Sequence, residues 1–142
     1  MILIDANLLL YAYDPSSSHH AASKAWLETT LSGSQFVRFA WMTLWAFLRI
    51  STSARVYERP LSIAEAEQAV ASWLAQPVVG ILDPGERHWE ILRRLMTSGQ
   101  VAGSLVMDAA LAALAVEHGA TLYTTDRGFA RFAELRWTNP VA

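Results

Sequence analysis

The sequence predicts a three-layer α/β fold in which helices flank a mostly parallel sheet. Short apolar stretches typical of strands alternate along the chain with longer segments of helical character, as in α/β proteins. No hairpin signal such as Asn-Gly joins two apolar stretches, which favours parallel strands over antiparallel ones. The length of 142 residues suits one domain, so we expect residues 1–142 to form a single unit.

The first half of the chain contains two predicted strands and three predicted helices. The strand "MILI" is apolar without a break, and the helix after it ends at the Asp14-Pro15 turn signal. The second helix follows a run of serines that can cap it, and it ends before Gly33. In chain order these elements are strand 1–4, helix 6–13, a helix within 16–34, strand 35–39 and helix 41–54.

The second half continues the alternation after a loop at residues 55–60. Ser62 and Glu65 form a capping box that begins the next helix, and Pro77 ends that helix. A later helix, nearly all apolar, is capped by Ser104 and stopped by Gly119. The predicted elements are helix 61–77, strand 78–82, amphipathic helix 83–100, helix 104–119, strand 120–125, short helix 127–135 and edge strand 136–139.

Composition and charge exclude several classes of protein. Hydrophobic residues make up 53% of the chain and charged residues 17%, enough apolar material for a large core. A signal peptide has a basic segment before its apolar run, and no such segment precedes the first apolar run here. The stretch "FAWMTLWAFL" is too short to cross a bilayer. The absence of cysteine excludes disulfides and thiolate metal sites, and the net charge of −2 argues against a general polyanion binder. We therefore expect a cytoplasmic protein with no membrane segment.

Two acidic residues follow predicted strands directly. Asp5 comes after the first strand and Asp126 after the fourth. In open parallel sheets the ligand crevice lies outside the carboxyl ends of the strands, so the two acids are expected to converge there. Taken singly, each is better explained as a helix N-cap, because Asp is a favoured capping residue.

A third acid, Asp108, lies in the first turns of the apolar helix at 104–119. No Lys or Arg lies within a helical turn of it, and a buried carboxylate without a partner costs several kcal/mol. One explanation is a core Asp that accepts backbone hydrogen bonds. The other is a divalent cation, because clustered carboxylates raise one another's pKa values unless a hard cation lies among them. The second explanation predicts an Mg²⁺ or Mn²⁺ site with Asp5, Asp108 and Asp126 as ligands, able to activate water and neutralise phosphate charge.

Four stretches of the chain carry a resemblance to a known family. They are "MILIDANLLLYAY", "WAFLRISTSARVYERPLS", "DAALAALAVEHGATLYTTDRGFARF" and "RWTNP". Together they cover nearly the whole chain in order. The sequence resembles a PIN-domain ribonuclease of the VapC toxin family, the toxins of VapBC toxin–antitoxin pairs.

This resemblance implies a PIN-like parallel sheet in the order 3-2-1-4-5 and Mg²⁺- or Mn²⁺-dependent endonucleolytic cleavage of RNA. It also implies a homodimer and a VapB-type antitoxin whose C-terminal segment blocks the groove. The expected function is thus that of a toxin endoribonuclease of a type II pair. The family's metal-site acids match Asp5, Asp108 and Asp126, and its supporting polar positions match Asn7 and Thr125. We add Arg49 and Arg127 as candidates for binding flanking phosphates.

Two positions depart from the pattern of many relatives. Ala46 stands where they carry a Glu, and Gly128 stands where they carry a further Asp. These departures leave the number of metal ions open, and they keep open an alternative, a catalytically lapsed PIN domain that only binds RNA or protein. A receiver-like or haloacid-dehalogenase-like phosphotransfer protein is set aside, because those folds need a Lys at a late strand end and the only lysine is Lys24.

Overall fold

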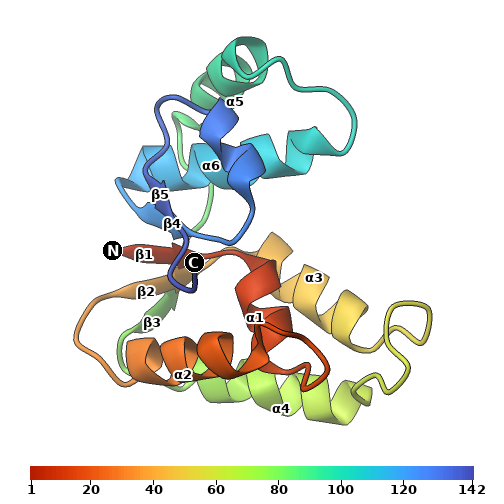
Figure 1. The fold of residues 1–142 in the computed structure, drawn as a ribbon. Helices are drawn as coiled ribbons and strands as arrows, with labels where there is room; N and C mark the ends of the chain where they lie inside the picture. The colour runs from red at the N-terminus through yellow and green to blue at the C-terminus, as the bar shows by residue number, and fades with distance from the viewer.

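The computed structural model describes every residue from Met1 to Ala142 and contains one five-stranded sheet with helices on both faces (Figure 1). The strands are β1 (Ile2–Ile4), β2 (Val37–Phe39), β3 (Val79–Ile81), β4 (Thr121–Tyr123) and β5 (Trp137–Thr138). The helices are α1 (Ala6–Ala12), α2 (His20–Leu31), α3 (Trp41–Ser51), α4 (Ile63–Leu74), α5 (His88–Ser98) and α6 (Leu105–His118), with a 3₁₀-helix η1 (Arg127–Arg131). None of these helices combines the length and apolar character that a membrane span requires.

The sheet has the strand order β3-β2-β1-β4-β5, and every neighbouring pair is parallel. This confirms the predicted parallel α/β fold and the order 3-2-1-4-5. The strands are shorter than predicted, and the segment expected to form a short helix over 127–135 is a 3₁₀-helix that ends at Arg131. The element types are therefore right, while several boundaries are wrong by a few residues.

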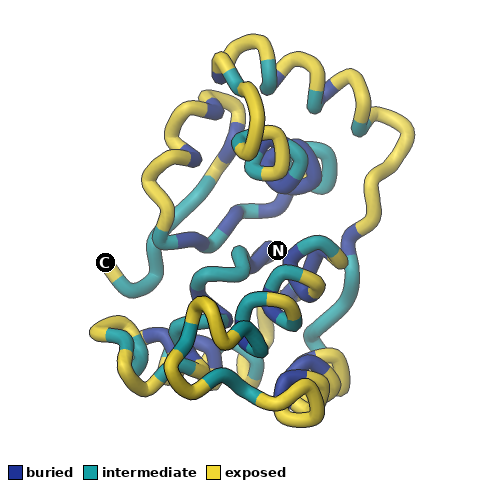
Figure 2. Tube along the Cα trace, turned by 90° about the vertical axis from the view of Figure 1, so that its right-hand side faces the viewer, coloured by how far each residue is buried: buried dark blue, intermediate teal, exposed yellow.

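Each face of the sheet carries its own hydrophobic core. Helices α1 to α4 cover one face, and α5, α6 and η1 cover the other (Figure 1). In β1, Ile2 and Ile4 pack into the first core, and Leu3 packs into the second. The central strand is thus buried on both sides, which explains why "MILI" is apolar without alternation. Figure 2 shows this buried layer along the strands, with exposed residues on the outer sides of the helices.

Trp73 joins the elements of the first core. Its side chain is almost fully buried, and its ring packs 4.8 Å from Phe47 and 5.7 Å from both Phe39 and Tyr13, measured between ring centroids. These contacts connect α4 to α3, to β2 and to the end of α1. Aromatic pairs at such separations stabilise a core beyond the burial of area alone.

The helix ends follow the predicted signals in part. The capping box of α4 is present, with the Glu65 amide donating to the Ser62 hydroxyl at 3.1 Å and the Ser62 amide donating to Glu65 at 2.9 Å. Gly119 ends α6 with a φ of 67°, a conformation that favours glycine. The expected cap by Ser104 is wrong, because its side chain forms no capping hydrogen bond.

Replacing Ser62 with Ala is expected to destabilise the fold by about 1 kcal/mol, the usual cost of losing a helix N-cap. Urea unfolding measures the change. Ser34→Ala is the matched control, because Ser34 is exposed and its side chain forms no hydrogen bond, so its unfolding midpoint should stay unchanged. Equal midpoints for the two variants would show that the capping box contributes nothing.

Candidate active site

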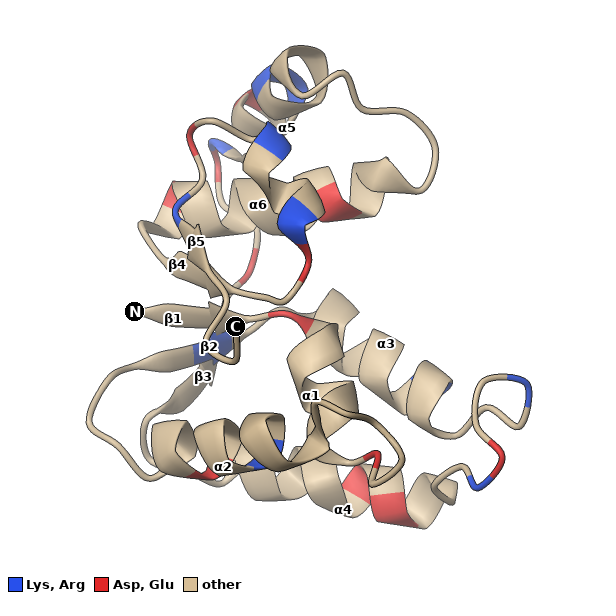
Figure 3. Cartoon of the chain, in the orientation of Figure 1, with Lys and Arg blue, Asp and Glu red and all other residues tan.

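The carboxyl ends of β1 and β4 lie side by side and place two acids together. Ile4 pairs with Tyr123 in the parallel register, and the Asp5 amide donates to the Tyr123 carbonyl at 3.0 Å. Asp5 directly follows β1, and Asp126 follows β4 after two threonines. The predicted convergence of these acids on one edge of the sheet is therefore present. Figure 3 shows this acidic region near the middle of the molecule, where β1 leads into α1 and β4 leads towards η1.

The hydroxyl of Thr124 connects the polar groups at this edge. It donates to Asp5 Oδ2 at 2.8 Å and accepts from the Asp126 amide at 3.0 Å and from Asn7 Nδ2 at 3.3 Å. Thr124 is fully buried, so its hydroxyl is shielded from water, while its partners Asp5 and Asn7 are partly buried. Its neighbour Thr125, the supporting position expected from the sequence, forms no side-chain hydrogen bond within the chain.

Asp5 and Asp126 also serve as helix caps. Asp5 Oδ1 accepts from the Ala6 amide at 2.8 Å at the start of α1, and Asp126 Oδ1 accepts from the Gly128 amide at 2.7 Å at the start of η1. The capping interpretation is thus confirmed for both residues. It does not compete with a role in a site, because each cap uses one carboxylate oxygen and leaves the other for different partners.

Asp108 lies in the first turns of α6 and is only partly buried. The expectation of a buried helix holds from Ala109 onward, whereas Val106 and Met107 before Asp108 are exposed. Asp108 accepts no hydrogen bond within the chain. The alternative of a structural Asp held by backbone amides is therefore wrong.

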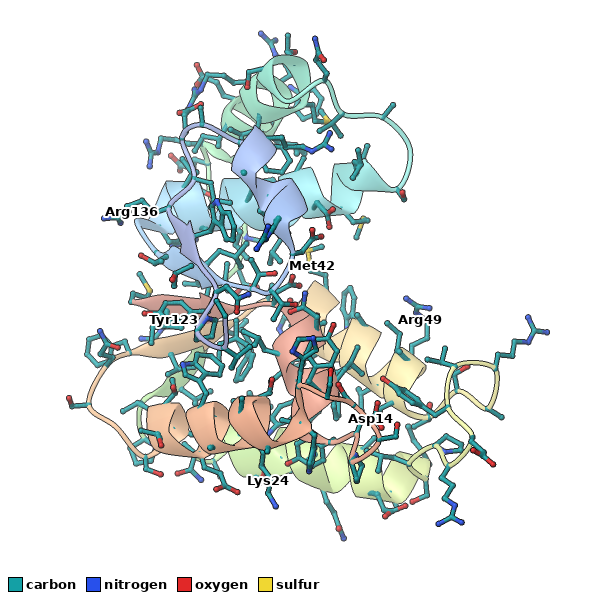
Figure 4. All side chains as sticks on the ribbon, in the orientation of Figure 1. Asp14, Lys24, Met42, Arg49, Tyr123 and Arg136 are labelled. Atoms are coloured by element: carbon teal, nitrogen blue, oxygen red, sulfur yellow. The ribbon has the colours of Figure 1, made fainter.

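A cavity of about 480 Å³ brings Asp5 and Asp108 together with one side of α3. Arg49 and Ala46 line this cavity, whereas Arg127 and Asp126 do not. The remaining lining residues are Ala6, Met42, Thr43, Trp45, Met107 and Leu111. Figure 4 shows Met42 where α3 begins and Arg49 farther along the same helix. One wall of the cavity thus carries the two acids, and the α3 wall is mostly apolar, with Thr43 and a single Arg.

The pKa shifts show that the three acids interact. Burial raises the pKa of Asp5 despite the hydrogen bonds from Thr124 and Ala6, and the charges of Asp108 and Asp126 raise it further. Partial burial also raises the pKa of Asp108, the charge of Asp126 adds to this, and the charge of Arg131 opposes it. Asp126 therefore lies close enough to both acids to affect their ionisation, although it does not line the cavity.

The donor set fits a hard divalent cation. Carboxylate and amide oxygens are the ligands that Mg²⁺ and Mn²⁺ prefer, and the buried Asn7 Oδ1 has no hydrogen-bond partner. As the side chains stand, no three acidic or histidine residues lie close enough to form a complete metal site. The carboxylates repel one another, and a shared cation is the group that would draw them together.

Comparison with known proteins decides the family. A model of the PIN domain matches residues 2–135. The chain belongs to the PIN-domain family. Among curated relatives of this PIN domain, ribonuclease VapC37 of Mycobacterium tuberculosis is 45% identical over 142 residues, covering 100% of this chain and 99% of the relative.

Solved structures show the same fold for this PIN domain. VapBC2 of Rickettsia felis, bound to a DNA fragment from its promoter, aligns with a TM-score of 0.70 at 18% identity and 98% coverage of each chain. VapC20 of Mycobacterium tuberculosis, a toxin that cleaves the sarcin-ricin loop, aligns with a TM-score of 0.68 at 17% identity, covering 96% of this chain and 99% of VapC20. The likeness therefore extends over the full length of the PIN domain.

Neutralising Asp108 should change the pH dependence of stability in the metal-free protein. Because its pKa is raised, the native state keeps this proton to higher pH than the unfolded chain does. As pH rises above about 4 and through the native pKa of Asp108, the wild type therefore loses the stability that this proton contributes, a loss that is absent in Asp108→Asn. The advantage of the variant should grow over this range to at most about 1 kcal/mol, since solvent screens a partly exposed charge.

Urea unfolding in EDTA at a series of pH values tests this expectation. The matched control is Asp83→Asn, since Asp83 is exposed and its side chain forms no hydrogen bond. The stability difference between control and wild type should not follow the same curve. A loss of stability in Asp108→Asn at neutral pH would contradict the view that this carboxylate is unpaired and repelled.

Proposed function

We propose that this PIN domain is the toxin endoribonuclease of a type II toxin–antitoxin pair and hydrolyses RNA phosphodiester bonds with Mg²⁺ or Mn²⁺. The observation that carries the proposal is a cluster of three acidic side chains that no basic side chain of the chain pairs with. Asp5, Asp108 and Asp126 interact with one another, yet the ion pairs of the chain, His88–Glu117 and Arg94–Glu134, involve none of them. Carboxylates concentrated without a cation raise the free energy of the native state, which metal binding would relieve.

Each residue of the site has a distinct proposed role. Asp5 and Asp108 hold the metal ion, and Asp126 binds it or orients the attacking water. A bound divalent cation would supply an activated water and neutralise charge on the phosphate. Thr124 fixes the rotamer of Asp5 through its hydrogen bond to Oδ2. Arg49 is suited to bind a phosphate that flanks the scissile bond, since its guanidinium forms no ion pair within the chain.

The departures at Ala46 and Gly128 favour the second candidate, a lapsed PIN domain that binds without cleaving. They remove carboxylates that many relatives carry. At position 128 a Cβ atom would lie 2.9 Å from Asp126 Oδ1, so a side chain there requires Asp126 to shift. At position 46 the small side chain leaves open space in the cavity. The three remaining carboxylates are sufficient ligands for one ion, so we favour the catalytic interpretation.

We also propose a VapB-type antitoxin and a second copy of the chain as protein partners. Support comes from an apolar face made by α3 and the start of α6. On it Trp41 is 44% exposed, Trp45 is 64% exposed and Met107 is 55% exposed. Exposed apolar residues gathered in this way are typical of protein contact surfaces. The face borders the cavity, so a partner bound there would lie beside the acids.

The purified, antitoxin-free protein is expected to cleave RNA in Mg²⁺ or Mn²⁺ and to be inactive in EDTA. Asp5→Ala should lower the cleavage rate by more than about 100-fold, because it removes a metal ligand and the partner of Thr124. Sequencing of RNA ends after expression of each protein identifies the cleavage sites. Asp83→Ala is the control, since Asp83 is an exposed acid that does not line the cavity. Intact cellular RNA with both metals would favour the binding-only candidate.

Ala46→Glu should tighten Mn²⁺ binding, because Ala46 lines the same cavity as Asp5 and Asp108. One added carboxylate ligand is expected to raise the affinity by about tenfold, comparable with the effect of other changes around a metal site. Isothermal titration calorimetry measures the dissociation constant. The control is Ala64→Glu, an exposed position in the first turn of α4. Unchanged affinity in Ala46→Glu would contradict the view that the missing Glu weakens the site.

A further inference from the structure

We propose that Arg131 binds the phosphate backbone of the RNA beside Asp108 and is a substrate-binding residue of this site. The inference rests on the proposed function, since it names a residue that would hold the substrate. Nothing in the order of residues distinguishes Arg131 from the other arginines. What distinguishes it is how the fold holds its side chain and where it lies relative to the acids.

The guanidinium of Arg131 is oriented by backbone carbonyls of two different elements. Its Nε donates to the Gly128 carbonyl at 3.2 Å, and its Nη1 donates to the Gly99 carbonyl at 3.3 Å. Gly99 is the C-cap of α5, and Gly128 belongs to η1. A guanidinium has more N–H groups than these two bonds use, so donors remain for a ligand. A side chain held in advance loses less entropy when it binds a phosphate.

Arg131 lies beside the acidic cluster without forming an ion pair with it. Its Nε donates to the carbonyl of Gly128, whose amide donates to Asp126 Oδ1 at 2.7 Å, so the guanidinium is held beside the Asp126 cap. Yet no carboxylate oxygen lies within 4.0 Å of the Arg131 guanidinium, since the ion pairs of the chain are His88–Glu117 and Arg94–Glu134. Arg131 is therefore a cation kept near the acids but not neutralised by them.

The geometry of η1 explains why Arg127 and Arg131 differ. In a 3₁₀-helix each residue turns by about 120°, so side chains four positions apart point to different sides. The two arginines at the ends of η1 therefore do not form one basic patch. Figure 3 shows η1, with its basic positions, beside the part of α6 that carries the acidic position. Of the two, only Arg131 donates a hydrogen bond to the end of α5.

Electrostatics explains what such a cation contributes. Asp5, Asp108 and Asp126 repel an incoming phosphodiester, and charges about 4 Å apart interact by several kcal/mol at an effective dielectric constant near 20. A fixed guanidinium at the border of the cluster offsets part of this repulsion. It also offers the fork of N–H donors that matches phosphate oxygens. An RNA backbone can use both the positive charge and the fork of N–H donors, whereas a neutral ligand gains nothing from the charge.

The test measures RNA binding without cleavage. A 12-nucleotide fluorescent oligouridylate is titrated with the Asp5→Asn protein in EDTA at several KCl concentrations, and anisotropy reports the binding constant. One lost phosphate contact should reduce the slope of log K against log salt by about 0.7 for a single strand. We expect this reduction when Arg131→Ala is added, with weaker binding at low salt. Arg131→Lys should keep most of the slope.

The matched control is Arg136→Ala. Arg136 is also exposed and also donates to a backbone carbonyl, that of Gly119 at 2.7 Å, but Gly119 caps the C-terminal end of α6, whereas Asp108 lies near its N-terminal end. Its loss should leave the slope unchanged. Arg131→Gln separates charge from structure, because it keeps an N–H donor for a carbonyl but has no charge. Under our proposal its slope falls as in Arg131→Ala, and this variant also serves if Arg131→Ala fails to fold.

The outcomes distinguish this inference from the proposed function. Equal slopes for the Arg131→Ala and Arg136→Ala proteins would overturn the role of Arg131, even if the wild type cleaves RNA. A lower melting temperature of Arg131→Ala with an unchanged slope would also overturn it, because Arg131 would then only stabilise the fold. A reduced slope together with no cleavage by the wild type in Mg²⁺ or Mn²⁺ would support Arg131 and overturn the endoribonuclease.

Discussion

The buried hydroxyl of Thr124 determines how the candidate site is held together. It connects Asp5 after β1, the backbone at Asp126 after β4 and the side chain of Asn7 on α1. The parallel pairing of β1 with β4 puts these strand ends at one level, and the hydroxyl then fixes the rotamer of Asp5 within that frame. Its one proton and two lone pairs are all used, so the network has no freedom to rearrange without losing a buried hydrogen bond. The fold therefore contributes orientation to the site as well as proximity.

Much of the fold was predictable because its signals are local or periodic. The unbroken apolar "MILI", the capping box at Ser62 and the stop at Gly119 each reflect a short-range physical preference, and the family resemblance added the strand order. The helix boundaries were less predictable, since Ser104 has the chemistry of a cap but not the geometry. Capping depends on the backbone angles at one residue, which the sequence does not determine by itself.

The candidate site was predictable in its acids but not in their supporting residues. Asp5 and Asp126 follow apolar strands, and Asp108 stands out on an apolar helix, so each could be identified from its neighbours in sequence. In the "TTD" segment the resemblance matched Thr125, whereas the alternation of an extended chain places Thr124 on the same side as Asp126. Arg131 could not be found this way, because its importance depends on the carbonyls of Gly99 and Gly128, which come together only in the folded chain.

The acids of this site have two tasks that need different properties of the carboxylate. Capping needs only an acceptor oxygen, which Asn also provides, whereas binding a cation needs the negative charge. Asp5 and Asp126 cap α1 and η1 through Oδ1, and a neutral Asn could accept the same hydrogen bonds. Capping alone therefore does not require their negative charges. Asp108 caps nothing and accepts no hydrogen bond, yet it keeps a charge that its surroundings disfavour. A protein selected for stability alone would have little reason to keep three such charges together. Their presence together is most simply explained by a positively charged ligand. The guanidinium of Arg131, fixed at the border of the cluster, leaves room for that cation and favours the binding of an RNA phosphate next to it.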